Sequence, residues 1–478
     1  MRWRRLTILA LALAAPAVVS VPAYGQDRAV LRVAFPSEDG SLTPYTFTNG
    51  YALMTLVYDT LSWRDAAGVA RPWLARSIRR RAGGRQIEVT LRRGARWHDG
   101  RPLTADDVVF TFRYMKTHVH PRFTPQLREL AGVTASGPLT VVFTLRDAAL
   151  GFEDQPLADV PILPRHLWER LAPGRLAPAG VPVGSGPYRL VRHVAGRSYR
   201  FEANRGYVRG RPAVNRIDVP IIGDQQQIAA GLRGGSLDAA PVVAPAGTRL
   251  EQPPSARLGR ADSYTGTVLE LNLTRPPFDR LQARRAVARA LDLGQIAASG
   301  RGAGRQLRAS RGVLHPRSPW AGTTVLGRFD AAAARVAFSE QGVGTFAVAA
   351  SRSDPVRLEA AARVVRALRA AGAPARLAAL SPAALNRALA TATFDAAVVG
   401  SPALASYDPA FLRAVFGNPA DAPLNDGGYR SARFEQLADG VERASTVAAR
   451  RRAVQAELRL LADDLPVIPL FFGGTTFA

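Results

Sequence analysis

The sequence predicts an α/β fold divided into more than one domain, on three observations. The chain has 478 residues, enough for two or three domains of ~100–200 residues each. Hydrophobic residues make up 47% and charged residues 21%, which is a globular composition. Segments with strand periodicity alternate with segments of helical periodicity. No apolar run after residue 25 is long enough for a polytopic membrane protein.

The first half of the chain predicts short strands separated by turns, with one well-marked helix. Thr104 and Asp107 form a capping box, so a helix is expected from there through Met115. The residues from Asp65 to Gly68 suit a hairpin turn. Strands are expected at residues 30–35, 87–91 and 140–145, and a helix running into a strand at residues 50–63.

The second half predicts longer helices between apolar strands. Leu358, Val365 and Leu368 share one face of a helix, which Gly372 and Pro374 end. Strands are expected at residues 267–273, 392–399 and 467–472, and a last helix over residues 454–465.

The N-terminus has the three parts of a secretory signal peptide. Arginines in residues 2–5 precede an apolar run over residues 6–21, and Ala23-Tyr24-Gly25 is a small-x-small cleavage site. We expect the mature chain to begin at Gln26 and to work in the periplasm. The sequence has no cysteine, so disulfides, cysteine metal ligands and a lipoprotein anchor are not expected.

The chain is strongly basic, with 63 basic and 38 acidic residues and a net charge of +25. All of the basic residues except Lys116 are arginines, a choice that GC-rich codon usage also explains. The densest basic run, at residues 76–81, is short and lacks interleaved aromatic residues, so we expect no nucleic-acid partner.

Catalytic and metal-binding patterns are weak. The sequence has no HExxH, GxSxG or P-loop motif, and the isolated His118-x-His120 pair is a common pattern. Ser185 is followed by Gly186 and Pro187, and the proline has no N–H for an oxyanion hole. We therefore expect a binding protein rather than an enzyme, with no catalytic residue, bound metal or cofactor.

Six segments of the chain carry sequence patterns that occur together, in the same order, in one family of proteins. They are residues 42–75 with Leu42-Thr43-Pro44 and Arg71-Pro72-Trp73, residues 90–108, Val183 to Tyr188, residues 271–292, Tyr407-Asp408-Pro409, and residues 465–470. In this order they resemble the extracytoplasmic solute-binding proteins of ABC importers, in family 5, the peptide- and nickel-type family.

The resemblance implies a two-lobed periplasmic-binding-protein-like II fold with an extra subdomain in lobe I. It implies a ligand held at the hinge, an ABC permease in the inner membrane as partner, and a monomer. Closure around a ligand that binds the closed state better fits this arrangement. The expected divisions are a signal peptide at 1–25, lobe I at 26–267 with a subdomain at about 46–175, lobe II at 268–464, and a return to lobe I at 465–478.

The resemblance also implies the residues that contact the ligand. Tyr407 is the strongest candidate, while Asp408, just before Pro409, suits a helix N-cap better than a ligand contact. The full expected set is Tyr45, Phe47, Tyr51, Glu270, Asn272, Tyr407 and Asp408.

At several ligand-binding positions the chain differs from both kinds of family member, those that bind peptides and those that bind nickel chelates. Peptide-binding members often carry a tryptophan and an amine-pairing aspartate where this chain has Pro402 and Ala405. Nickel-chelate-binding members carry a tryptophan and a methionine where this chain has Ala403 and Ala52. A peptide, a metal chelate and another small solute therefore stay open, and the arginine excess raises the hypothesis that the solute is anionic.

Two other functions stay open from the sequence. One is a sensor of the same fold that presents its solute to a membrane signalling partner. The other is a secreted hydrolase, which requires a compact Ser/His/Asp cluster.

Overall fold

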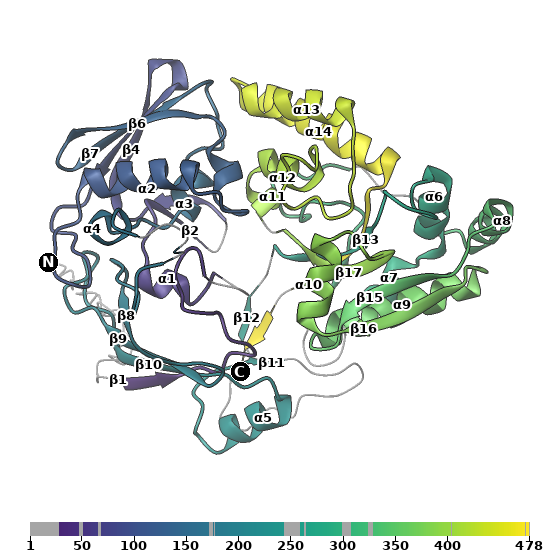
Figure 1. Ribbon diagram of the computed structural model, residues 1–478, viewed down its shortest axis with the longest axis horizontal. Helices are drawn as coiled ribbons and strands as arrows, with labels where there is room; N and C mark the ends of the chain where they lie inside the picture. Colours follow the sequence, from purple (N-terminus) through teal and green to yellow (C-terminus); the bar gives the residue numbers. More distant parts are fainter. Residues whose placement is uncertain are drawn as a thin grey trace, which may run out of the picture.

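The computed structural model describes residues 28–46, 51–65, 68–171, 175, 177–242, 259–261, 264–298, 307–323, 328–402, 404–473 and 475–477. The expected signal peptide and Phe47 lie outside these residues. The described chain forms two lobes (Figure 1). We call residues 28–242 the N-terminal lobe and residues 264–472 the C-terminal lobe. None of the described helices is long and apolar enough to cross a membrane.

The N-terminal lobe contains two four-stranded sheets. The first has the order β1-β10-β9-β8, with β1 (Arg28–Arg32) parallel to β10 (Val214–Pro220), followed by β9 (Ser198–Ala203) and β8 (Tyr188–Val194). The second is antiparallel, with the order β4 (Ala75–Arg81), β5 (Gln86–Leu91), β7 (Thr140–Leu145) and β6 (Leu130–Gly137). Helix α2 (Ala105–Thr117) packs on β6 and β7. The hairpin of β2 (Ser62–Arg64) and β3 (Ala70–Pro72) extends from this lobe.

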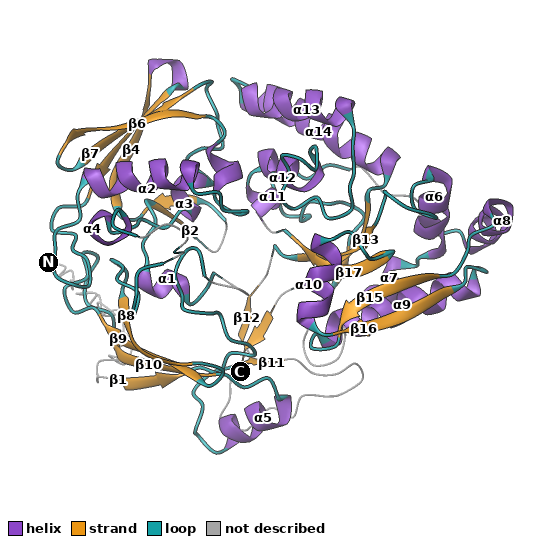
Figure 2. Ribbon diagram, viewed as in Figure 1, coloured by secondary structure: helices purple, strands orange, loops and turns teal. Residues whose placement is uncertain are grey.

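The C-terminal lobe is built on one mixed six-stranded sheet (Figure 2). Its order is β14 (Arg308–Ala309), β18 (Val467–Phe472), β13 (Gly266–Leu271), β17 (Ala396–Ser401), β15 (Phe346–Ser351) and β16 (Ala375–Leu380). Helix α9 (Pro355–Ala370) packs against β15, β16 and β17, and α13 (Ala432–Arg443) pairs with α14 (Val447–Asp464). The pair of α13 and α14 lies at the top of this lobe in Figure 1.

Shorter elements complete both lobes. The short helices are α1 (Met54–Val57), α3 (Pro156–Asp159), α4 (Arg165–Trp168), α5 (Gln225–Arg233), α6 (Leu281–Ala290), α7 (Leu293–Ala297), α8 (Ala331–Gln341), α10 (Pro382–Ala390), α11 (Leu404–Tyr407) and α12 (Leu412–Phe416). The 3-10 helices include η1 (Ala82–Gly84), η2 (Thr124–Leu127) and η4 (Pro409–Phe411).

The end of the described chain differs from the expected return to lobe I at 465–478. Strand β18 pairs with β13 inside the six-stranded sheet, because all six of its side chains are apolar and buried. Only β19 (Thr475–Phe477) leaves that sheet, and it pairs with β11 (Pro241–Val242) and β12 (Gly259–Ala261). These three short strands lie between the lobes in Figure 1. The other expected lobe boundaries stay predictions.

Most of the strongly patterned elements were predicted correctly. The alternation at residues 87–91 is confirmed by β5, whose side chains alternate between buried and partly buried. The capping box is also confirmed, since the Thr104 N–H donates to Asp107 Oδ2 at 2.9 Å. Strands β8, β9 and β10 were not predicted from the sequence.

Many arginines bond to neutral backbone oxygens. The Arg92 side chain donates to the Trp73 carbonyl at 2.6 Å, and Arg113 donates to the Val133 carbonyl at 3.0 Å. Arg284, only 7% exposed, donates to the Asp464 carbonyl at 2.7 Å. Because a guanidinium carries five N–H donors in a rigid plane, one arginine can bridge several carbonyls, which lysine does less well.

Candidate functional site

A cavity of about 710 Å³ lies between the two lobes, and we call it the large chamber. Tyr51, Arg64 and Arg122 line it from the N-terminal lobe, and Ser401 and Tyr407 line it from the C-terminal lobe. A chamber with walls from both lobes is where hinge closure would enclose a small molecule.

Tyr407, at the end of α11, lies where the lobes meet. The Arg64 guanidinium lies 4.5 Å from the centre of its ring, and the Tyr264 ring centre is 4.7 Å away. The β2–β3 turn also reaches this ring, since a Cβ added to Gly68 would lie 3.2 Å from it. Gly68 has a φ of +80°, so both the turn and the close approach to Tyr407 favour glycine here.

An ion pair between half-buried Arg122 and buried Asp159 lines the large chamber from the N-terminal lobe. Arg122 binds Asp159 with two bonds, Nε to Oδ2 at 2.9 Å and Nη2 to Oδ1 at 2.6 Å. Its guanidinium also lies 4.4 Å from the centre of the Tyr51 ring. Burial raises the pKa of Asp159, but the Arg122 charge and bonds outweigh it, so the pKa lies below its usual value. Asp159 is therefore ionised, and its negative charge neutralises that of Arg122, one of the two cations that line the chamber.

Arg64 is the second cation, and within the described part of the chain it forms no ion pair. One Nη donates to the Asp154 carbonyl oxygen at 2.6 Å, and the buried Nε has no hydrogen-bond partner. His120 adds no charge at neutral pH, because burial, and then the Arg122 charge, lower its pKa to about 4. The large chamber thus carries one positive charge in excess.

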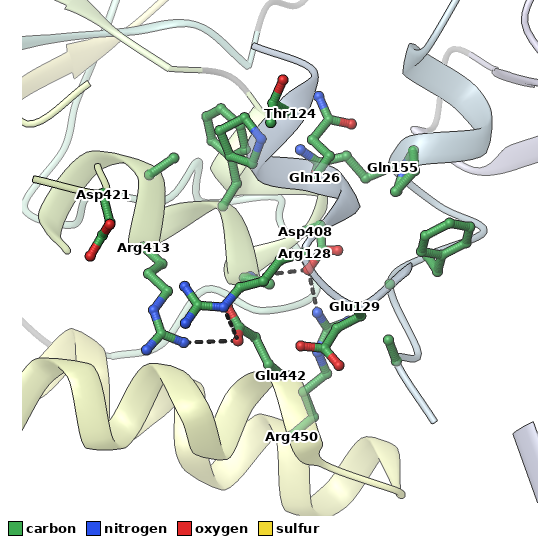
Figure 3. Close-up of a pocket in the computed structure, with 18 residues that line it drawn as sticks. Thr124, Gln126, Arg128, Glu129, Gln155, Asp408, Arg413, Asp421, Glu442 and Arg450 are labelled. Carbon is green, nitrogen blue, oxygen red and sulfur yellow. Dashed lines mark hydrogen bonds and ion pairs between the residues drawn. The ribbon is translucent and has the colours of Figure 1, made fainter. Parts of the chain in front are cut away.

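A second cavity between the lobes, of about 290 Å³, is the small chamber (Figure 3). Asp408 and Arg450 form an ion pair in its wall, and Asp408 also caps η4 by accepting from the Ala410 N–H at 3.0 Å. Glu442 binds Arg413 of its own lobe at 2.8 Å and Arg128 of the other lobe at 3.5 Å.

The N-terminal lobe approaches the Asp408–Arg450 pair through a glycine. A Cβ added to Gly151 would lie 1.9 Å from Asp408 Oδ2 and 2.9 Å from Arg450 Nη1. Any side chain at this position would collide with the opposite lobe, so the observed contact of the lobes depends on glycine.

Three of the predicted site residues lie in these chambers. Tyr51 and Tyr407 line the large chamber, and Asp408 lines the small one. The N-cap expected of Asp408 is observed together with its ion pair. Phe47, as noted, lies outside the described residues.

Tyr45 packs inside the N-terminal lobe, and its expected ligand contact stays a prediction. Its hydroxyl donates to the His118 carbonyl at 2.7 Å, and its ring meets Tyr114 and His120 edge to face. It is not among the residues that line either chamber.

Asn272 and Glu270 are also not among the residues that line either chamber. Asn272 is fully buried, and its Nδ2 donates to the carbonyls of Ala392 and Phe394 at 2.9 and 2.8 Å. Glu270 faces Asp426; burial, and then that neighbouring carboxylate, raise its pKa to about 8. The expected ligand contacts of Asn272 and Glu270 stay predictions.

The charged residues of the large chamber were missed by sequence reasoning. Arg64, Arg122 and Asp159 come from three separate segments that only the fold brings together. In a chain with so many arginines, neither arginine stood out from the others.

Comparison with known proteins gives a consistent family match. Residues 69–422 match the model of the bacterial extracellular solute-binding proteins, family 5 Middle. Protein XP55 of Streptomyces lividans is 32% identical over 240 residues, which is 49% of this chain and 43% of that protein. The oligopeptide-binding protein AppA of Bacillus subtilis is 28% identical over 45% of this chain and 41% of that protein. The chain therefore spans less than half the length of the curated relatives it matches.

Two solved structures share the fold over nearly the whole chain. AppA from Bacillus subtilis, in complex with a nonapeptide, superposes with a TM-score of 0.82 at 22% identity and covers 94% of both chains. NikZ from Campylobacter jejuni, in complex with Ni(L-His), superposes with a TM-score of 0.81 at 22% identity and covers 95% of this chain and 94% of that one. The predicted two-lobed α/β fold is confirmed.

Proposed function

The chain belongs to the bacterial extracellular solute-binding proteins of family 5, and from that membership we propose that it captures a small solute between its lobes and delivers it to an ABC permease. We propose that the chain works in the periplasm as a monomer, after removal of residues 1–25 and without a lipid anchor. It binds its solute without chemical turnover.

The observation that carries this proposal is the large chamber, with walls from both lobes and Tyr407 where they meet. A solute in it touches Tyr51 and Arg64 on one side and Tyr407 on the other, so it binds the closed arrangement better than an open one. This differential affinity is what closes a hinged protein around its ligand.

We further propose that the solute carries an acidic group, in a peptide-like molecule, a metal chelate or another small acid. Arg64 supports this, because it is a cation in the chamber wall without a carboxylate partner among the described residues. A carboxylate there would form charge-assisted hydrogen bonds, which are stronger than bonds between neutral groups.

Native mass spectrometry of the chain from Gln26 tests the capture of a solute. We expect an adduct on the purified protein that is lost from the Tyr407→Ala variant and kept by Phe329→Ala, a matched truncation of an exposed aromatic residue. An adduct that survives Tyr407→Ala would place the solute elsewhere and refute this site. The adduct's mass separates a peptide from a metal chelate.

A further inference from the structure

Trp63, on strand β2, is an exposed aromatic residue in the wall of the large chamber, with 38% of its surface accessible. The other rings in this wall are already covered. Guanidinium groups lie against the rings of Tyr51 and Tyr407. His120 stacks on a neighbouring phenylalanine ring at 4.4 Å, and Phe411 is only 5% exposed. Among the described residues that line the chamber, Trp63 therefore has the ring surface that a bound molecule can reach.

A second tryptophan supports this ring. Trp73 follows β3, the strand that pairs with β2 in the hairpin, and the centres of the Trp63 and Trp73 rings are 5.5 Å apart. The Arg209 guanidinium lies 3.7 Å from the centre of the Trp73 ring. Trp63 thus packs on a side chain that is itself held from elsewhere in the N-terminal lobe.

A buried carboxylate also holds Trp73. Asp59, only 3% exposed, accepts a hydrogen bond from Trp73 Nε1 at 3.0 Å. The hydroxyl groups of Ser185 and Tyr207 donate to the same carboxylate at 3.0 and 2.8 Å. Burial raises the pKa of Asp59 to about 6, so the group is ionised at neutral pH and its hydrogen bonds are charge-assisted. The two tryptophans are therefore fixed before a solute arrives, which lowers the ordering cost of binding.

A fixed, exposed indole ring beside a cation suits an acid that carries an aromatic ring. Trp63 precedes Arg64 in the chain, and both residues line the large chamber. Pairs of aromatic rings gain free energy beyond the burial of their surface. We propose that Trp63 is a specificity-determining residue and that the solute is an aromatic acid, whose ring packs on Trp63 while its acidic group binds Arg64. The inference rests on the proposed capture function and narrows the solute to acids with an aromatic ring.

Titration calorimetry on the chain from Gln26 tests this role with two probes of equal charge. They are naphthylacetate and its fully hydrogenated counterpart, decahydronaphthylacetate. We expect the wild type to bind the aromatic probe about 2- to 12-fold more tightly, which is the gain from one pair of aromatic rings. The Trp63→Leu variant should bind both probes equally, because its side chain is apolar but has no ring.

Two further variants make the result specific. Trp63→Phe keeps a ring at this position and should retain a preference for naphthylacetate even where Trp63→Leu folds poorly. Phe329→Leu is the matched control, since Phe329 is also exposed and lines neither chamber, and it should keep the wild-type preference.

The outcomes separate this inference from the proposed function. A wild type without a preference for naphthylacetate, or the same preference in Trp63→Leu, overturns the role of Trp63 and leaves the capture function standing. A co-purified solute without an aromatic ring does the same. If the wild type binds neither probe, the inference alone falls when native mass spectrometry still shows an adduct that Tyr407→Ala loses, and both proposals fall when it shows none.

Discussion

Replacing Gly151 with alanine should weaken solute binding without destabilising either lobe. Gly151 follows β7 in the N-terminal lobe, and the atoms it approaches belong to the Asp408–Arg450 pair of the C-terminal lobe. The added methyl group would collide only while the lobes are in contact. An open arrangement relieves the collision entirely.

The size of the effect follows from the distances. The new Cβ would lie 1.9 Å from Asp408 Oδ2, and a carbon and an oxygen need roughly 3.2 Å or more, so something must shift by more than 1 Å. Overpacking of this kind typically costs about 1–3 kcal/mol. Because this overpacking cost applies to the closed state alone, it corresponds to about a 5- to 150-fold loss of affinity.

Calorimetric titration with the solute recovered from the wild-type protein measures this loss, and thermal unfolding without solute measures stability. Gly132→Ala is the matched control, because its added Cβ meets nothing within 4 Å. Unchanged affinity in Gly151→Ala would refute the argument that contact at Gly151 is required for binding. A drop in unfolding temperature without solute would show that the clash cannot be relieved by opening.

Three other outcomes are expected. Burial lowers the pKa of His98 to about 4, so its contribution to stability should fall by at most about 3 kcal/mol as pH drops from 6.5 to 4, because the unfolded histidine binds the proton more tightly. In urea unfolding, the stability of the wild type relative to His98→Gln should therefore fall over this range; a wild-type-minus-variant difference that rises on acidification would contradict the argument. Arg64→Gln should abolish any preference for trialanine over trialanine amide in calorimetric titration, and a preserved preference would move the acid site elsewhere. Asn272→Ala should cost about 2–4 kcal/mol in urea unfolding and leave solute affinity unchanged, whereas an equal loss of affinity would restore Asn272 as a ligand contact.

The sequence predicted the elements whose signals are local. The capping box at Thr104, the alternation in β5 and the apolar face of α9 each depend on a few neighbouring residues, and all three are observed. The sheet of β8, β9 and β10 was missed, and the position of β18 in the six-stranded sheet depends on pairing with a strand nearly 200 residues earlier.

The site was only partly predictable, since its charges come from distant segments. Tyr407 was found because its segment resembles the family. Arg122 and Asp159 gave no signal, because their role arises only when the fold brings the segment before η2 to the end of α3 and the two side chains bind. Asn272 lies in a segment that resembles the family, but its side-chain amide donates to the backbone carbonyls of Ala392 and Phe394. The sequence alone did not show these two hydrogen bonds.

The bonds between arginines and neutral carbonyls have a consequence for how the protein responds to ionic strength. A guanidinium bonded to a carbonyl, as in Arg92 or Arg113, keeps its full positive charge without a neighbouring anion. Without the three arginines of residues 1–25, the chain expected from Gln26 carries a net charge of +22 that repels itself. Dissolved ions shorten the reach of that repulsion to about 10 Å at 0.1 M, while direct hydrogen bonds to carbonyls persist. Added salt should thus stabilise this fold.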